Sequence, residues 1–256
     1  MRTLRPRPCP DYRQSQFFIV TWHRNNLSSA VSRTVSAMAA KEQRTAPATK
    51  RPDRDLREVT FVVLDLETTG ASPTVGAGIT EIGAIKVKGG EKIAEFETLI
   101  NPMMPIPEFI TNLTGIDEFT IADAPPLEDI FHHFMSFCGD PEENVLVAHN
   151  SPFDLSFLKA AALNLEIDWP DYRVLDTVRM ARSVLTQDDL PNVKLGTLAE
   201  FFEVEIMPTH RALADVQATV EILHALIDRV GSHGVSSINS LEDFVLTKKK
   251  GRSFYS

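Results

Sequence analysis

Carboxylate and imidazole side chains occur in three short segments of the chain, and their types suit a metal site. In chain order they are Asp65, Glu67, Asp154, His210 and Asp215. The four acids stand in otherwise apolar segments, where an unpaired charge costs several kcal/mol. These segments carry no matching set of lysines or arginines. We therefore expect divalent cations to balance the charge, because carboxylate oxygens are good ligands for them.

The first two acids end a run of β-branched and apolar residues. Residues 59–67 read as a buried strand, and Asp65 and Glu67 are two apart in it, so both project from the same face. Gly70 follows in the segment 68–70, where glycine permits a turn and the close approach of a ligand. This pattern predicts a divalent site at the end of a strand. An exposed strand end with incidental acids is the alternative.

The third acid has a competing explanation as part of a helix cap. Asp154 follows Ser151 and Pro152, which read as a capping serine and a proline at the first helical position. The helix also follows a short buried strand over residues 145–148. Asp154 thus lies near a sheet end, where ligand sites form in α/β proteins. Both roles stay open on this pattern.

The remaining two residues open the long helix expected over residues 209–230. Asp215 lies between Leu213 and Val216, close to the apolar stripe of that helix. His210 falls in or just before its first turn, and imidazole can take a proton from water near neutral pH. An ordinary surface acid and a structural or exposed histidine are the alternatives.

The apolar periodicity predicts an α/β fold with a mixed sheet. Strands are expected over residues 59–67, 79–88, 92–100, 145–148 and 173–175, with a hairpin at Gly89-Gly90. Helices are expected over residues 107–113, 127–138, 152–165, 177–185, 195–202 and 209–230. Three strands that include a hairpin, followed by alternating helix and strand, are typical of such a sheet.

Bulk composition indicates a soluble globular protein and excludes a membrane span. The chain is 43% hydrophobic and 24% charged. Its longest apolar runs are about four residues, whereas a membrane helix needs roughly 20. The two cysteines, Cys9 and Cys138, fit no metal-binding spacing. They favour a reducing, cytoplasmic setting.

Charge divides the chain into three parts. Residues 1–57 hold 12 Lys/Arg against 4 Asp/Glu, a net charge of +8. Because the whole chain has a net charge of −9, residues 58–256 carry −17. This basic stretch reads as a disordered extension, with a transit peptide or a true start at Met38 as alternatives. Residues 58–231 form the expected domain. Residues 232–256 read as a tail whose basic cluster, 248–252, is solvated or touches phosphates.

Taken together, the three segments resemble the motifs of the DEDDh exonucleases of the ribonuclease H-like superfamily. Asp-x-Glu-Thr-Thr-Gly begins at Asp65, His-Asn-x-x-Phe-Asp at His149 and His-x-x-x-x-Asp at His210. The resemblance covers roughly residues 59–230 and is closest to the proofreading epsilon subunit of bacterial DNA polymerase III. A histidine five residues before the last aspartate marks the His branch. The sister branch has a tyrosine four residues before it, where this chain has Arg211.

The resemblance implies a ribonuclease H-like fold, a mixed five-stranded sheet flanked by helices, and a two-metal phosphodiester hydrolase. Two Mg²⁺ or Mn²⁺ ions would be held by four carboxylates, with His210 as general base. The implied ligands are Asp65, Glu67, Asp154 and Asp215. Nucleoside monophosphates would then leave one by one from a 3′ end.

Four further residues are implied in substrate binding, namely Thr68, Gly70, Thr114 and Asn150. In relatives the turn after the first motif holds the terminal nucleotide, and the segment from Thr114 lies near the terminal base. Asn150 belongs to the second motif. The mechanism requires nothing of His149, and Asp176 is better explained as the cap of the next helix.

The expected substrate is single-stranded DNA or a frayed DNA 3′ end, in proofreading or repair. Such a role needs a DNA polymerase or a repair complex as partner, because the domain contains no polymerase. An exoribonuclease of the same fold is the nearest alternative, since contacts to the 2′-OH cannot be read from these motifs. A non-catalytic module that binds nucleic acid or a polymerase is the alternative from another class. Some bacterial relatives carry an excision-nuclease-like domain, and nothing after residue 231 resembles one.

Overall fold

The structure is a computed structural model, and it describes residues 51–247. A five-stranded sheet in the order β3-β2-β1-β4-β5 forms its centre. β1 and β2 pair antiparallel, as do β2 and β3, whereas β4 and β5 run parallel to β1. The predicted mixed five-stranded sheet is therefore confirmed. The strands are β1 (Thr60–Thr68), β2 (Ile79–Lys88), β3 (Glu91–Leu99), β4 (Asn144–Ala148) and β5 (Arg173–Asp176).

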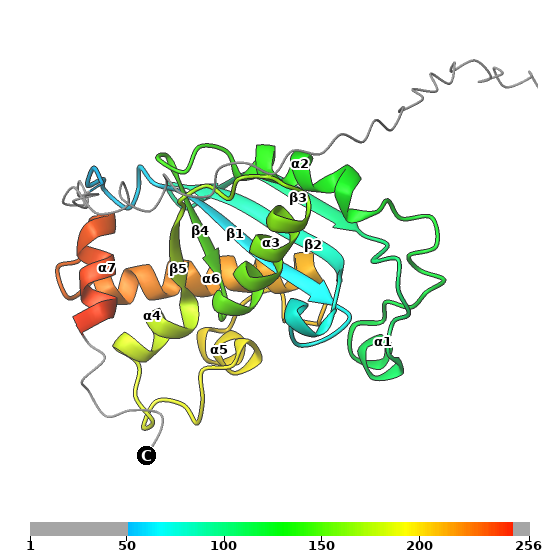
Figure 1. Ribbon diagram of the computed structural model, residues 1–256. Helices are drawn as coiled ribbons and strands as arrows, with labels where there is room; N and C mark the ends of the chain where they lie inside the picture. The colour runs from blue at the N-terminus through cyan, green and yellow to red at the C-terminus, as the bar shows by residue number, and fades with distance from the viewer. Residues whose placement is uncertain (1–50, 248–256) are drawn as a thin grey trace, which may run out of the picture. The chain divides into compact units, whose positions relative to one another are not determined.

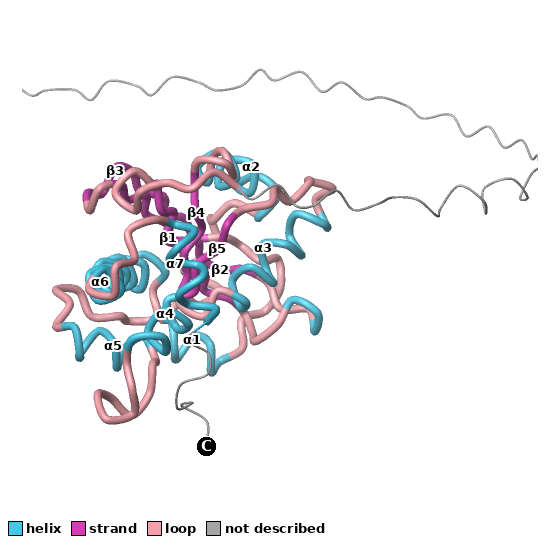
Figure 2. Tube along the Cα trace, turned by 90° about the vertical axis from the view of Figure 1, so that its left-hand side faces the viewer, coloured by secondary structure: helices cyan, strands magenta, loops and turns pink. Residues whose placement is uncertain are grey.

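Helices cover both faces of this sheet, and Figures 1 and 2 place α6 and α3 on opposite sides of the strands. The helices are α1 (Glu108–Thr114), α2 (Leu127–Cys138), α3 (Pro152–Asn164), α4 (Thr177–Val184), α5 (Leu195–Phe202), α6 (Ala212–Gly231) and α7 (Ile238–Thr247), with a 3₁₀ turn, η1 (Pro73–Val75). One apolar core joins the sheet to α4, α5, α6 and α7, and a second joins it to α2 and α3. Between residues 51 and 247, no helix is both long and apolar enough to cross a membrane.

The alternation of side chains along β1 decides which layer receives the acids. Phe61 and Val63 point into the core shared with α6, while Val62 and Leu64 point into the core shared with α3. Side chains two apart lie on one face of a strand. Asp65 and Glu67 therefore continue the face that is covered by α6.

The hairpin between β2 and β3 has the turn that its sequence predicts. Gly89 and Gly90 both have positive φ, 60° and 87°. A two-residue turn of this kind matches the twist of the flanking strands, and glycine adopts it without steric cost. The hairpin pairs β3 with one edge of β2. The other edge of β2 pairs antiparallel with β1, which brings the start of β2 beside the end of β1.

The segments that flank the expected domain belong to the same core. In α7, which the sequence did not predict, Ile238 and Leu241 are fully buried, and Leu56 is 7% exposed. Backbone hydrogen bonds join Leu56 N–H to Ser236 and Ile238 N–H to Arg54, each at 2.9 Å. Residues 51–57 and 232–247 thus close one end of the core. The basic cluster 248–252 and residues 1–50 lie outside the described residues.

Candidate functional site

The carboxyl ends of β1 and the neighbouring β4 meet at one edge of the sheet. β1 pairs with β4 only from Thr60 to Val63, so Asp65 and Glu67 lie beyond the paired stretch. The chain leaves β4 at Ala148 and enters α3 at Pro152. The first turn of α3 therefore lies beside the end of β1, as is usual for sites in sheets of this kind.

Asp154 lies in that first turn and is 1% exposed. Its Oδ1 atom is buried and has no hydrogen-bond partner among the described residues. The predicted capping serine is wrong, because Ser151 has helical φ and ψ (−47° and −27°) and makes no side-chain cap bond. The cap pattern therefore does not account for the Asp154 carboxylate, whose orphaned oxygen suits a cation.

Asp215 shapes the chain that precedes α6. Its Oδ1 atom accepts hydrogen bonds from the backbone N–H of Thr209 at 2.8 Å and of His210 at 3.2 Å. His210 is exposed and left-handed, with φ of 58°. The helix consequently begins at Ala212, three residues later than predicted.

These elements bring the five predicted residues together. One ligand atom each from Glu67, His210 and Asp215 lies within 4.8 Å of the other two. Asp65 is close enough to Asp154, Asp215 and Glu67 for their charges to raise its pKa. Residues from β1, α3 and the start of α6, up to 150 positions apart, thus form one acidic cluster.

Burial raises the pKa of all four carboxyl groups, and neighbouring charge raises three of them further. The pKa of Asp65 is well above its usual range, and the pKa values of Glu67 and Asp154 rise to about 8. The pKa of Asp215 is also raised, although the N–H groups of Thr209 and His210 oppose the effect of burial. Without a cation, such a cluster retains protons at neutral pH. Its all-oxygen acid set is the kind that Mg²⁺ and Mn²⁺ prefer.

Three residues beside the cluster were missed by the sequence analysis. Glu81 on β2 is fully buried and pairs with Arg211, the residue that follows His210. Gly83 on β2 lies opposite Asp65, directly under the start of α6. Glu81 carried the signal used for Asp65, because it is an acid inside an apolar strand. The pairing with Arg211 joins segments 130 residues apart, so no local pattern could reveal it.

The turn after β1 contains two of the predicted substrate-binding residues. Thr68 is buried and donates its hydroxyl hydrogen bond to the Gly70 carbonyl at 2.8 Å. A Cβ added at Gly70 would lie 3.3 Å from Ala77 Cβ, which is a tight contact. Thr69 Oγ1 accepts the Gly78 N–H at 2.9 Å and lies 3.4 Å from Met104 Sδ. The turn is therefore fixed before any ligand binds.

Asn150 lies at the turn between β4 and α3. It is exposed and left-handed, with φ of 69°, and its N–H donates to Asp176 Oδ1 at 3.1 Å. The same oxygen accepts the Val178 N–H at 3.0 Å, which confirms Asp176 as the cap of α4. His149 Nδ1 is 2.9 Å from Thr177 Oγ1, and burial lowers the His149 pKa to about 4. The side chains of Asp176 and His149 therefore hold this turn together.

Thr114 is buried at the end of α1, away from solvent. Its hydroxyl donates to the Ile110 carbonyl at 3.0 Å and accepts the Ile116 N–H at 3.0 Å. The exposed apolar residues of this helix are Phe109 and Leu113, 66% and 49% exposed. They are four residues apart and hence share a face. These two side chains, which the sequence analysis did not single out, form the exposed apolar surface of α1.

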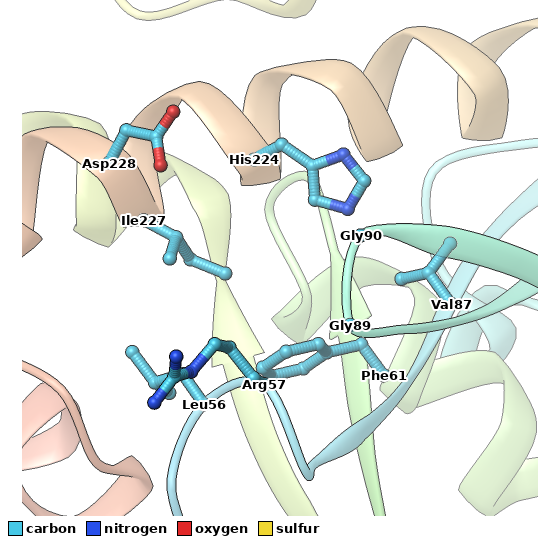
Figure 3. Close-up of a pocket in the computed structure, with 9 residues that line it drawn as sticks. All are labelled: Leu56, Arg57, Phe61, Val87, Gly89, Gly90, His224, Ile227 and Asp228. Atoms are coloured by element: carbon cyan, nitrogen blue, oxygen red, sulfur yellow. The ribbon is translucent and has the colours of Figure 1, made fainter.

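A separate cavity of about 360 Å³ lies at the opposite end of β1 (Figure 3). Phe61, His224 and the Gly89–Gly90 turn are among its walls. Phe61 precedes Glu67 by six residues, which is about 20 Å along a strand. The cavity is thus remote from the carboxylates, and we assign it no part in their chemistry.

Comparison with known proteins identifies relatives over most of the described residues. The family model RNase_T, described as an exonuclease family, matches residues 62–223. A Mycobacterium tuberculosis protein, named as a candidate bifunctional exonuclease/endonuclease, is 48% identical over 202 residues, covering 77% of this chain and 31% of that protein. The PolC-type DNA polymerase III of Caldanaerobacter subterraneus is 42% identical over 189 residues, covering 74% of this chain and 13% of the polymerase. The chain therefore spans less than a third of either relative.

Solved structures share the fold at lower identity. Exonuclease X, in complex with 5′ overhanging duplex DNA, superposes with a TM-score of 0.55 at 22% identity, covering 72% of this chain and 99% of that one. Escherichia coli Exonuclease I, in complex with a dT13 oligonucleotide, gives a TM-score of 0.60 at 19% identity, covering 69% and 42%. At these identities the likeness concerns the fold alone.

Proposed function

Because the chain belongs to the RNase_T exonuclease family, we propose that it hydrolyses single-stranded or frayed DNA from the 3′ end and releases nucleoside monophosphates. As a member of that family the chain is an exonuclease-type hydrolase. The observation that carries the finer proposal is the buried carboxylate cluster with its orphaned Asp154 oxygen and the adjacent His210. This combination supplies ligands for divalent cations and a proton acceptor in one place.

The proposed cation ligands are the four clustered carboxylates. They fit Mg²⁺ or Mn²⁺ because the donors are all oxygens, because burial penalises the uncompensated anions, and because one oxygen has no protein partner. When bound, two such ions would neutralise the negative charge of the ligands and the charge that develops on the phosphate. The proposed ligands are Asp65, Glu67, Asp154 and Asp215.

His210 is the proposed general base. It is exposed at the edge of the cluster, and one of its ring nitrogens lies within 4.8 Å of oxygens of both Glu67 and Asp215. Imidazole accepts and returns protons readily near neutral pH. In this position it would take the proton of the attacking water and then release it to solvent, while Asp215 holds its backbone in place.

The DNA strand is proposed to approach over the turn after β1 and over α1. Met104, in the loop before α1, contacts Thr69 in that turn, and Figure 1 places α1 beyond the end of β1. Phe109 offers an exposed ring on α1, and bases stack on such rings with little regard to sequence, for about 1–3 kcal/mol each. Single-stranded nucleic acid, with its bases unpaired, suits this surface.

A role in DNA proofreading or repair is the proposed setting. Relatives named as PolC-type DNA polymerase III and as a candidate bifunctional exonuclease/endonuclease support it. The exonuclease family model matches residues 62–223, and a polymerase or a repair complex is the proposed partner for activity at a replication or repair site.

The test uses purified full-length chain with 5′-labelled single-stranded DNA and RNA of the same sequence, in Mg²⁺, Mn²⁺ or EDTA. We expect a ladder that shortens from the 3′ end on DNA, and its loss in EDTA. Asp65→Ala should abolish the ladder. Phe109→Ala should raise KM several-fold for DNA with little change in kcat, whereas Leu163→Ala, an exposed residue on α3, is the matched control.

Each outcome has a definite reading. A ladder on RNA alone would support the proposed hydrolysis but contradict the proposed substrate, which would then be RNA. Release of the label as a mononucleotide from the 5′ end would contradict the proposed direction. Full activity of Asp65→Ala, or activity in EDTA, would overturn the assignment of the carboxylate cluster as the metal site.

A further inference from the structure

An ion pair with a buried carboxylate lies beside the carboxylate cluster, outside the set of residues that carries the family motifs. Glu81 stands opposite Glu67 in the register of β1 and β2, and its side chain is 1% exposed. It accepts Arg211 Nη2 at 2.6 Å, Arg211 Nε at 3.1 Å and the Ala212 backbone N–H at 2.9 Å. One carboxylate thus binds both the side chain just before α6 and the first N–H of that helix.

Two carboxylates therefore hold four consecutive residues. Asp215 binds the N–H groups of residues 209 and 210, and Glu81 binds the side chain of residue 211 and the N–H of residue 212. His210 lies between these two anchors in the left-handed conformation, with φ of 58°. This conformation is unfavourable for an L-residue with a side chain and persists only where the surroundings impose it.

Gly83 allows the start of α6 to lie close enough to β2 for Glu81 to reach it. A Cβ at this position would lie 2.6 Å from the Ala212 carbonyl carbon and 2.7 Å from Leu213 N. The start of α6 therefore rests directly on the backbone of β2. Glu81, two residues earlier on the same face of the strand, is thereby brought into contact with the helix N-terminus.

We propose that Glu81 and Arg211 are positioning residues that hold His210 in its left-handed conformation beside Glu67 and Asp215. The inference rests on the proposed function, in which His210 accepts a proton. Arginine suits the role because its planar fork binds a carboxylate through two parallel hydrogen bonds, which a lysine cannot do. Burial, Asp215 and Glu81 raise the pKa of Glu67, and the charge of Arg211 partly opposes that rise, so the experiment must separate positioning from an effect on the metal ligands.

The experiment measures kcat, KM and Mg²⁺ affinity for Arg211→Lys, Arg211→Ala and Glu81→Gln on single-stranded DNA. Arg211 is 44% exposed, so its replacement is compatible with folding. We expect kcat to fall roughly 10-fold to 100-fold, as for a misplaced catalytic group, with KM and Mg²⁺ affinity within about twofold. In a His210→Ala background, the same substitutions should cause no further loss of kcat, because their effect acts through His210.

Arg173→Lys is the matched control. The Arg173 side chain is more deeply buried than that of Arg211, at 7% exposed, and it donates hydrogen bonds to Asn239 Oδ1 at 2.8 Å and to the Pro52 carbonyl at 3.2 Å. Its replacement should lower Tm and leave kcat unchanged. A loss of kcat in Arg173→Lys equal to that in Arg211→Lys would mean that general destabilisation explains both, and would overturn the proposal.

Other outcomes also decide the matter. An unchanged kcat, an effect on KM or Mg²⁺ affinity alone, or a loss that adds fully to that of His210→Ala would each contradict positioning. If the wild-type chain hydrolyses no nucleic acid, the proposed function fails. Amide hydrogen exchange then still tests whether Glu81 and Arg211 hold residues 209–212 in place. Exchange at residues 209 and 210 should then quicken at least tenfold in Arg211→Ala. Unchanged protection would refute the positioning role of Glu81 and Arg211.

Discussion

Replacing Asp154 with asparagine should stabilise the metal-free protein. The Asp154 pKa is about 8 in the fold against an ordinary value of 3.8. At pH 7 the folded state keeps the group protonated, whereas the unfolded state ionises it. The difference of about three pKa units between pH 7 and the ordinary value corresponds to roughly 4 kcal/mol at 1.36 kcal/mol per unit. An asparagine side chain has no proton equilibrium, so this cost disappears in the variant.

The sign of the pH dependence follows from the raised pKa. Between about pH 4 and pH 8 the folded wild-type protein binds more protons than the unfolded chain, so its stability falls as pH rises. The advantage of Asp154→Asn should therefore be absent below pH 4, grow through neutral pH and level off above pH 8. Cations reverse the order, because only the wild-type carboxylate can bind them with full charge.

Urea unfolding in EDTA and in Mg²⁺, repeated from pH 4 to pH 9, measures both effects. Asp188→Asn, in an exposed loop, is the control and should change the free energy of unfolding by less than about 0.5 kcal/mol at any pH. A destabilised Asp154→Asn in EDTA at pH 7, or equal Mg²⁺ stabilisation of variant and wild type, would refute the reasoning.

Three further outcomes are expected. Gly83→Ala should destabilise the fold by about 1–3 kcal/mol and abolish activity, since its Cβ meets the backbone of α6. Gly196→Ala, with open space around it, should have neither effect, and equal Tm values for the two variants would contradict this. His210→Ala should lower kcat by about 10²–10⁴ with little change in Mg²⁺ affinity, and a wild-type rate across pH 6–9 would point to another base. Deletion of residues 1–57 should give a lower Tm in calorimetry than deletion of residues 1–50, because it also removes buried Leu56; the reverse order would be inconsistent with the fold.

Strand and helix patterns were readable from the sequence wherever packing and local preference agree. β2 and α2 begin and end at the predicted residues, because β2 is apolar and buried on both faces, α2 has apolar positions at helical spacing, and a glycine follows each element. The start of α6 was not readable. Asp215 draws the N–H groups of residues 209 and 210 out of the helix, and that competition depends on tertiary geometry.

The site was predictable in its chemistry and less so in its support. Acids in apolar segments reveal themselves because burial without a partner is costly. The contribution of Ser151 was misread, since a cap pattern in sequence does not fix the backbone angles that a cap needs. Glu81 carried the same signal as Asp65 and was overlooked, but its pairing with Arg211 could not be predicted because it depends on the sheet register and on the contact of Gly83 with α6, neither of which is local.

A crystal of the protein soaked in Mn²⁺, with anomalous scattering recorded near the manganese edge, would locate the proposed cations. We expect anomalous peaks within coordination distance of Asp65 and at least two of Glu67, Asp154 and Asp215. Strong peaks elsewhere on the protein with none in this cluster, at Mn²⁺ concentrations that support hydrolysis, would contradict the assignment of these carboxylates as the metal ligands.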